Sequence, residues 1–215
     1  MYSGTQRSLH AIRGLYGLAD AGGTHGDPVR VGAALLDGGC RLIQLRCKGW
    51  SDDEVVRAGR ELSARTPSTQ ATLIVNDRPH LVEPIGAQGV HVGQLDLSTR
   101  LARAQMPPGS LLGRSTHAEE HVLQALEDAD YLAFGPIWAT RNTDRDKGER
   151  GLAALKRVRT LVPSTVPLVA IGSITAERVP SVQRAGADAW AVIGAVRDAA
   201  DPLAATRSLL RAALP

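Results

Sequence analysis

Charged and amide side chains gather where a short apolar segment of this sequence ends. The segment RLIQLR (41–46) continues into Cys47 and Lys48. Alternation along an extended strand sends Gln44, Arg46 and Lys48 to the same side. Two cations and an amide at one rim are costly to bury without an anionic partner, so a phosphate ligand is a physical reason for their presence. Salt bridges to neighbouring loops are the alternative interpretation.

Two carboxylates follow the next two apolar segments. Asp77 ends the run TLIVND (72–77), and Asp96 comes just after GVHVG (89–93). Mg²⁺ prefers one or two protein carboxylates together with water and phosphate oxygens, so this pair predicts a Mg²⁺ site. Taken alone, Asp77 would also fit a helix cap ahead of Pro79. No Cys and His spacing suggests zinc.

Two glycines close the last two apolar segments at equivalent positions. Gly172 stands in AIGS, and Gly194 follows Ile193 in AVIGA. Glycine lets the main chain approach a ligand, and the loops after the seventh and eighth strands of many barrels bind phosphate. A turn is the alternative role. The histidines do not assemble with a nucleophile and a carboxylate into a triad, and His117 is interpreted as a structural hydrogen-bonding residue.

The elements that must position these residues alternate along the chain. Short runs rich in Val, Ile and Leu are separated by segments of helical periodicity, which is typical of repeated βα units. Eight units close most simply into a (β/α)8 TIM barrel; an open doubly wound sheet is the alternative, disfavoured because no GxGxxG follows the first run. The predicted strands are 14–20, 41–46, 72–77, 89–93, 110–115, 130–136, 167–173 and 189–195.

Local signals mark where several helices begin. Ser51 precedes an acidic first turn, and Thr116 stands ahead of Glu119 and Glu120, so both are predicted caps. Pro180 should kink or shorten its helix. The predicted helices include 52–65, 118–128 and 176–186.

One long charged segment, WATRNTDRDKGERGL (138–152), has no apolar periodicity and follows the sixth strand. Long loops in compact domains are usually functional or disordered, so its position predicts a lid over the ligand.

Length and composition bound the class of protein. The chain has 215 residues, 43% of them apolar, which predicts one domain over 14–215 after a flexible leader, 1–13. A scattered net charge of +3 and 3% aromatic residues argue against a nucleic-acid partner. No apolar run reaches the roughly 18 residues of a membrane span. Two cysteines outside any disulfide framework favour free thiols and a cytoplasmic location. A homo-oligomer is left open.

The strand-end motifs, in this order, resemble those of the thiamine phosphate synthase family. The resemblance covers about residues 14–203, and the motifs are LYGLAD, QLRCK, IVNDR, GVHVGQLDL, GRSTH, DYLAFGPIWAT, AIGSI and AVIGA. Any one of these strings is weak evidence. Eight in the family's order identify the chain as a member.

This resemblance implies two substrate sites and a Mg²⁺ site formed by Asp77 and Asp96. The residues implied to hold hydroxymethylpyrimidine diphosphate are Gln44, Leu45, Arg46, Cys47, Lys48, Asn76, Ser115 and Thr143, with Arg46, Lys48 and Ser115 as catalytic residues. Those implied to hold the thiazole phosphate are Thr140, Arg141, Asn142, Gly172, Ile193 and Gly194.

The implied reaction joins these two phosphorylated small molecules. Diphosphate departs, a pyrimidine-methyl cation forms, and the thiazole nitrogen captures it; a carboxylated thiazole also loses carbon dioxide. Fixed cations and Mg²⁺ suit a departing diphosphate better than a proton-transfer base does, which agrees with the missing triad.

The chain departs from the family pattern after the sixth strand. The family usually shows Thr-x-Thr-Lys there, whereas this sequence reads Thr140-Arg141-Asn142-Thr143. The expected lysine is therefore missing, and Arg141, Arg145, Lys147 or Arg150 is a candidate to replace it.

Two other functions compete with the synthase. A thiazole tautomerase-like paralogue would use a histidine where this chain has Pro136, and it would have no use for Asp77. A non-catalytic barrel that binds thiamine precursors is supported by the missing lysine alone.

Overall fold

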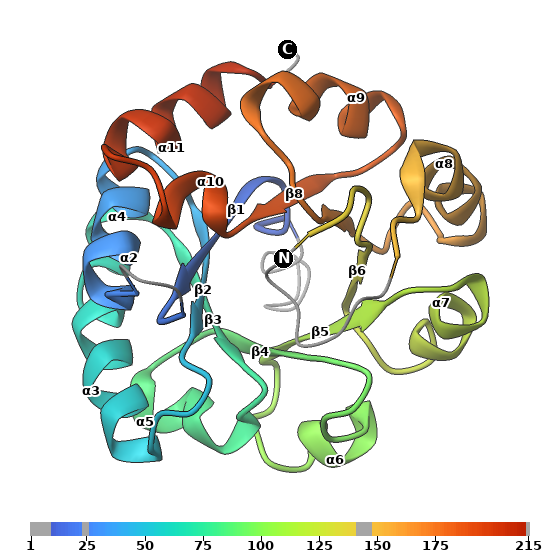
Figure 1. Ribbon diagram of the computed structural model, residues 1–215. Coiled ribbons are helices and arrows are strands. Elements are labelled where there is room, and N and C mark those ends of the chain that lie inside the picture. Colours follow the sequence, from blue (N-terminus) through green and yellow to red (C-terminus); the bar gives the residue numbers. More distant parts are fainter. Residues whose placement is uncertain (1–9, 23–25, 141–147, 214–215) are drawn as a thin grey trace.

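The computed structural model describes residues 10–22, 26–140 and 148–213, and its centre is a closed barrel of eight parallel strands (Figure 1). Each strand pairs with the next in sequence, and β8 pairs with β1 from Gly14 opposite Ala189 to Gly17 opposite Val192. The strands are β1 Gly14–Asp20, β2 Leu42–Arg46, β3 Thr72–Asn76, β4 Gly89–Val92, β5 Leu111–Thr116, β6 Tyr131–Phe134, β7 Leu168–Ile171 and β8 Ala189–Val192. The predicted (β/α)8 barrel is confirmed, and the closure excludes an open sheet.

Helices surround the strands on the outside of the barrel (Figure 1). They are α2 Pro28–Asp37, α3 Asp52–Ser63, α4 Thr66–Thr69, α5 Val82–Ile85, α6 Thr99–Arg103, α7 Glu119–Ala125, α8 Gly151–Leu161, α9 Val179–Arg184, α10 Gly194–Arg197 and α11 Pro202–Arg211, with the 3-10 turns η1 Pro79–Leu81 and η2 Ala176–Arg178. None of the helices in the described ranges is both long and apolar enough to span a membrane.

The local predictions at helix ends have mixed outcomes. Ser51 caps α3 in a capping box, in which its hydroxyl accepts from the Glu54 amide and Glu54 accepts from the Ser51 amide, as predicted. The prediction that Thr116 caps α7 is wrong, because Thr116 is the last residue of β5 and its hydroxyl donates to the Ala133 carbonyl. The predicted helix 176–186 is divided into η2 and α9, with Pro180 in the first turn of α9.

Two apolar layers hold the barrel together. The larger lies between the strands and the helices, and the smaller fills the barrel interior around Tyr16, Leu42, Ile74 and Leu111. Ile12, which falls within the leader expected from the sequence, is completely buried in the inner cluster. Each fully buried aliphatic side chain contributes about 1.5–3 kcal/mol to folding. Because both faces of the strands are buried, polar side chains are found mainly where the strands end, at the carboxyl side of the barrel.

Candidate active site

Two cavities lie side by side at the carboxyl ends of the strands. The larger, of about 620 Å³, is lined by residues that end β2, β3 and β4, and the smaller, of about 370 Å³, by residues that end β6, β7 and β8. They share five lining residues: Ser115, His117, Ile171, Ala191 and Ile193. A ligand in one cavity is therefore next to a ligand in the other.

Alternation along β2 divides the predicted stretch 44–48 between two environments. The side chains of Gln44, Arg46 and Lys48 line the larger cavity. Leu45 and Cys47 point the other way and are buried against the surrounding helices, with exposed fractions of 1% and 6%. Leu45 and Cys47 therefore do not present side chains to this cavity.

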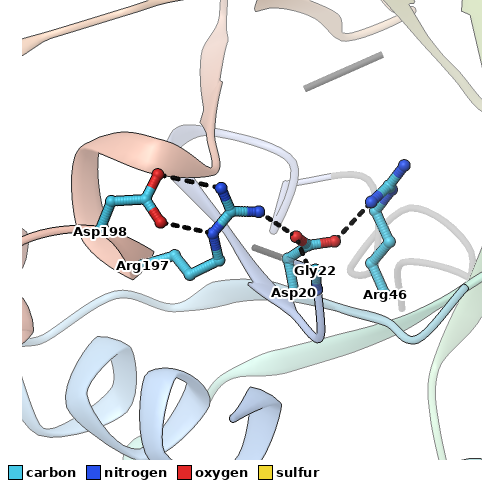
Figure 2. Close-up of polar contacts among 5 residues, drawn as sticks. All are labelled: Asp20, Gly22, Arg46, Arg197 and Asp198. Atoms are coloured by element: carbon cyan, nitrogen blue, oxygen red, sulfur yellow. Dashed lines mark hydrogen bonds and ion pairs between the residues drawn. The ribbon is translucent and has the colours of Figure 1, made fainter. Parts of the chain in front are cut away.

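Arg46 also belongs to an ionic chain that the sequence analysis missed. Figure 2 shows the Asp20 carboxylate between two guanidinium groups, with Arg46 on one oxygen at 2.5 Å and Arg197 on the other. Arg197 in turn donates to both oxygens of Asp198, at 2.7 and 2.9 Å. Asp20 is 1% exposed, so its charge requires these partners. Arg46 thus forms an ion pair with a buried residue at the end of the neighbouring strand, not the salt bridge to a loop that was the alternative interpretation.

A signal for Asp20 was present in the sequence. It is a charged residue that ends the apolar run of β1, and it pairs in register with Arg46 at the end of β2. Arg197 had no such signal because it lies on α10, one turn beyond the end of β8.

The predicted carboxylates, Asp77 and Asp96, both line the larger cavity. The Asp77 amide donates to the His91 carbonyl at 2.9 Å, and its φ of 61° turns the chain sharply after β3. One oxygen of Asp96 accepts from the Gly93 amide at 2.8 Å. A Cβ atom at Gly93 would lie 2.6 Å from that oxygen, so a larger residue there would shift the Asp96 carboxylate.

These two carboxylates fit a small divalent cation. Burial and the adjoining Asp96 carboxylate raise the pKa of Asp77, while the charge of Lys48 opposes this. A cation between the two groups would relieve their repulsion. Within the described ranges no cluster of three or more His, Cys, Asp or Glu forms a metal cage, and Mg²⁺ needs only one or two carboxylates when water and phosphate complete its shell.

A buried polar chain crosses the barrel interior below the larger cavity. The Gln44 amide donates to the Tyr16 hydroxyl at 2.7 Å, which lies 2.9 Å from the Tyr131 hydroxyl. Tyr131 is 3.2 Å from Nδ1 of His91, and Nε2 of His91 is 2.9 Å from the Ser115 hydroxyl. Burial lowers the pKa of His91 to about 4, so this imidazole is neutral near pH 7. The sequence analysis did not identify the two tyrosines.

The smaller cavity is built mainly from main chain and aliphatic groups. Thr140, Gly172, Ile193 and Gly194, all predicted for the thiazole phosphate, line it. Arg141, Asn142 and Thr143 lie outside the described residues. The Gly135 carbonyl oxygen lies 2.6 Å from Nδ1 of His117 and can only accept, so Nδ1 donates and forms the structural hydrogen bond predicted for this residue.

Two further cations line the cavities: Arg178, which the sequence analysis did not identify, and Arg150, one of its candidates to replace the missing lysine. Arg178 lines the smaller cavity, stacks 4.5 Å over the Trp138 ring and donates to the Ser173 carbonyl. The Ser173 hydroxyl donates to the Ala139 carbonyl at 2.6 Å, which fastens the loop after β7 to the loop after β6. Arg150, from the predicted lid, lines the larger cavity.

Cations, a carboxylate pair and glycine-lined main chain at the carboxyl end of a closed βα barrel define an enzyme-type barrel site for anionic small molecules. Comparison with known proteins makes the assignment specific. The family model described as thiamine monophosphate synthase matches residues 15–196, and the chain belongs to this family.

Individual relatives agree with the family model. The thiamine-phosphate synthase of Methanoculleus marisnigri is 43% identical over 189 residues, which are 87% of each chain. That of Anaeromyxobacter dehalogenans is 43% identical over 83% of this chain and 80% of its own. The solved thiamine phosphate pyrophosphorylase of Pyrococcus furiosus superposes with a TM-score of 0.86 at 30% identity, covering 95% of this chain and 96% of that one. The family, the transferase class and the thiamine-phosphate synthase activity predicted from the sequence are therefore confirmed.

Proposed function

We propose that the larger cavity binds hydroxymethylpyrimidine diphosphate, that the smaller binds the thiazole phosphate, and that the two react where the cavities meet. The observation that supports this proposal is the shared wall around Ser115 and Ile193, which the two adjoining cavities have in common. Holding both reactants in adjoining cavities removes the entropic cost of their encounter in the reaction itself.

The reaction requires one bond to break and one to form. The bond between the pyrimidine methylene carbon and the diphosphate oxygen breaks, and its electron pair leaves with the diphosphate. The thiazole nitrogen then donates its lone pair to that carbon. With the carboxylated thiazole, the bond from the ring to the carboxylate also breaks, carbon dioxide leaves, and the ring carbon keeps the electron pair and takes up a proton from water. Fixed positive charge beside the departing oxygen is the main requirement, and a general base is not needed for the bond between the two rings.

Arg46 and Lys48 carry this positive charge in the larger cavity. Asp20 holds the Arg46 guanidinium in place, so the group does not have to be ordered when the substrate binds. Gln44, Asn76 and Ser115 line the same cavity and supply neutral hydrogen-bonding groups. Asp77 and Asp96 would hold Mg²⁺, which when bound neutralises charge on the diphosphate.

The smaller cavity suits a phosphate held by the main chain. Gly172 has a φ of 114°, and a Cβ atom there would lie 2.6 Å from Pro136 Cα. Glycine at this position lets peptide N–H groups face the ligand, and with Gly194, Ile193 and Thr140 it would form the thiazole phosphate site.

Arg150 is the proposed replacement for the lysine missing at Thr143. Among the described residues of the predicted lid it is the cation that lines the larger cavity. Its charge would reach the diphosphate from the direction of the loop after β6.

The proposed location is the cytoplasm. Cys40 and Cys47 are both buried free thiols, which agrees with a reducing compartment.

The test is product formation by the purified chain. With both precursors and Mg²⁺, thiamine phosphate and diphosphate should form, and excess chelator should stop the reaction. Asp77→Ala should abolish turnover, whereas the control Asp53→Ala, which removes an exposed carboxylate from the first turn of α3, should not. No product with Mg²⁺ present contradicts the proposed function. Turnover in excess chelator contradicts the metal role alone.

A further inference from the structure

We propose that the buried chain Tyr16–Tyr131–His91 sets the direction of the Ser115 hydroxyl, so that Ser115 donates its proton into the substrate cavity. Tyr131 and His91 are then positioning residues for Ser115. This inference rests on the proposed function, in which Ser115 faces the pyrimidine diphosphate.

The direction follows from the donor at one end of the chain. The Gln44 side chain donates through Nε2 to the Tyr16 oxygen, so the Tyr16 proton is left to point to Tyr131. The Tyr16 hydroxyl is the donor in its bond to Tyr131, so the Tyr131 proton has Nδ1 of His91 as its remaining partner and points there.

Histidine passes this direction on through its tautomer. A neutral imidazole that accepts at Nδ1 carries its proton on Nε2, and Nε2 lies 2.9 Å from the Ser115 oxygen. Ser115 therefore accepts from His91. Its own proton has to point away from His91, and Ser115 lines both cavities.

Burial makes this order strict. Tyr16 and Tyr131 are 1% and 0% exposed, and His91 is 7% exposed. An unpaired donor or acceptor in such surroundings is costly, so a single reversed hydroxyl would leave two groups facing each other with the wrong polarity.

A glycine makes room for the central link. A Cβ atom at Gly113 of β5 would lie 2.1 Å from Cζ of Tyr131 and 2.4 Å from Nδ1 of His91. Any other residue at position 113 would occupy the space of the hydrogen bond between Tyr131 and His91. The chain is thus supported by a residue that takes no part in it.

The consequence for the ligand is a matter of polarity. Phosphate oxygens at neutral pH only accept hydrogen bonds, and a hydroxyl that was itself engaged as a donor to His91 would turn its lone pairs toward them. A Ser115 proton directed into the cavity presents the favourable partner without any reorganisation at the moment of reaction.

The first experiment reads the tautomer and does not depend on activity. In the ¹⁵N-labelled full chain, the His91 signals, identified by their loss in His91→Gln, should show Nε2 protonated and Nδ1 unprotonated at pH 7. A proton on Nδ1 would mean that the hydrogen bonds run in the opposite direction, and it would overturn the inference. Failure of the proposed function would instead appear as absence of product from the wild-type chain, whatever the tautomer.

The second experiment removes one hydroxyl of the hydrogen-bonded series, Tyr131, which does not line either cavity. Tyr131→Phe should lower kcat about tenfold and leave the KM for the pyrimidine diphosphate unchanged, because only the alignment of Ser115 is lost. In the Ser115→Ala background the same substitution should have no further effect on kcat. Additive losses would overturn the assignment to Ser115.

A matched control removes another buried hydroxyl from the same region. Thr116 is the next residue on β5, is 0% exposed and donates to the Ala133 carbonyl outside the chain. Thr116→Val should lower the melting temperature about as much as Tyr131→Phe and leave kcat unchanged. An equal fall of kcat in both variants would mean that the effect is structural and would overturn the inference.

Discussion

The two halves of the barrel mouth, where we propose two anion sites, are lined by different kinds of groups. The charged half, at the ends of β2 to β4, uses the side chains of Arg46, Lys48, Asp77 and Asp96. The glycine half, at the ends of β6 to β8, uses main chain around Gly172 and Gly194 together with aliphatic groups. In the charged half, side chains determine the charge of the cavity. In the glycine half, the backbone determines its shape.

This difference decides what a substitution can damage. Asp96 is exposed at the cavity, and its carboxylate accepts from the Gly93 amide of its own turn, so its replacement leaves the core intact. In the glycine half the backbone is packed tightly: a Cβ atom at Gly135 would lie 2.2 Å from the Ile171 carbonyl oxygen. We therefore expect substitutions in the charged half to affect chemistry and those in the glycine half to affect folding as well.

Asp96→Asn should have the largest effect among the variants that compare the two halves, second only to the complete loss expected for Asp77→Ala. The amide oxygen of Asn can still accept from the Gly93 amide, so the turn should stay and the melting temperature should change little. The loss of one carboxylate from the proposed Mg²⁺ pair should lower kcat/KM by about 10³-fold. Steady-state rates at saturating Mg²⁺ and a thermal melt measure both quantities. Wild-type rates would remove Asp96 from the metal site.

Gly172→Ala, in the glycine half, should have the opposite pattern: its main effect should be a loss of stability. The new methyl group would overlap Pro136 at a φ of 114°, which should cost about 2–4 kcal/mol of the free energy of unfolding and raise the KM for the thiazole phosphate. The matched control is Gly109→Ala, where φ is 83° but no atom lies within 4 Å, so only about 1 kcal/mol should be lost. Urea denaturation measures the free energy of unfolding of both variants. Equal losses would show that the positive φ, and not the close contact with Pro136, is what requires glycine at position 172.

The smallest expected effect concerns Cys47, which lies within the charged half in sequence but faces the helices. Burial is the main cause that raises the pKa of this thiol to about 12, and the negative charge of Asp20 is the second. At pH 8 only about one thiol in 10⁴ is then ionised, so iodoacetamide should label Cys47 very slowly in the native chain and readily in urea. Diphosphate with Mg²⁺ should not change the native labelling rate. Protection by these ligands would place Cys47 in the substrate site.

Much of the barrel and of its charged half was predictable from the sequence because strand signals are local. Alternating apolar runs located all eight strands to within a few residues, and polar residues at their ends identified Arg46, Lys48, Asp77 and Asp96 as cavity residues. The family motifs then supplied the activity, which no periodicity could have indicated.

The predictions failed or were incomplete where a residue's role depends on distant partners. Thr116 has the sequence position of a cap, but the pairing of β5 with β6 turned its hydroxyl to the Ala133 carbonyl. Asp20 and Arg197 are 177 positions apart, and only closure of β8 against β1 brings them together. Tyr16 and Tyr131 likewise meet only inside the closed barrel.

Residue order was therefore enough to establish the strands, the rim chemistry and the family, since each depends on neighbours in the chain or on short motifs. Tertiary structure alone decided which guanidinium groups share Asp20 and which hydroxyls form the buried chain to Ser115. The physical reason is that burial and hydrogen-bond partners are properties of the closed barrel, in which strands distant in sequence become neighbours.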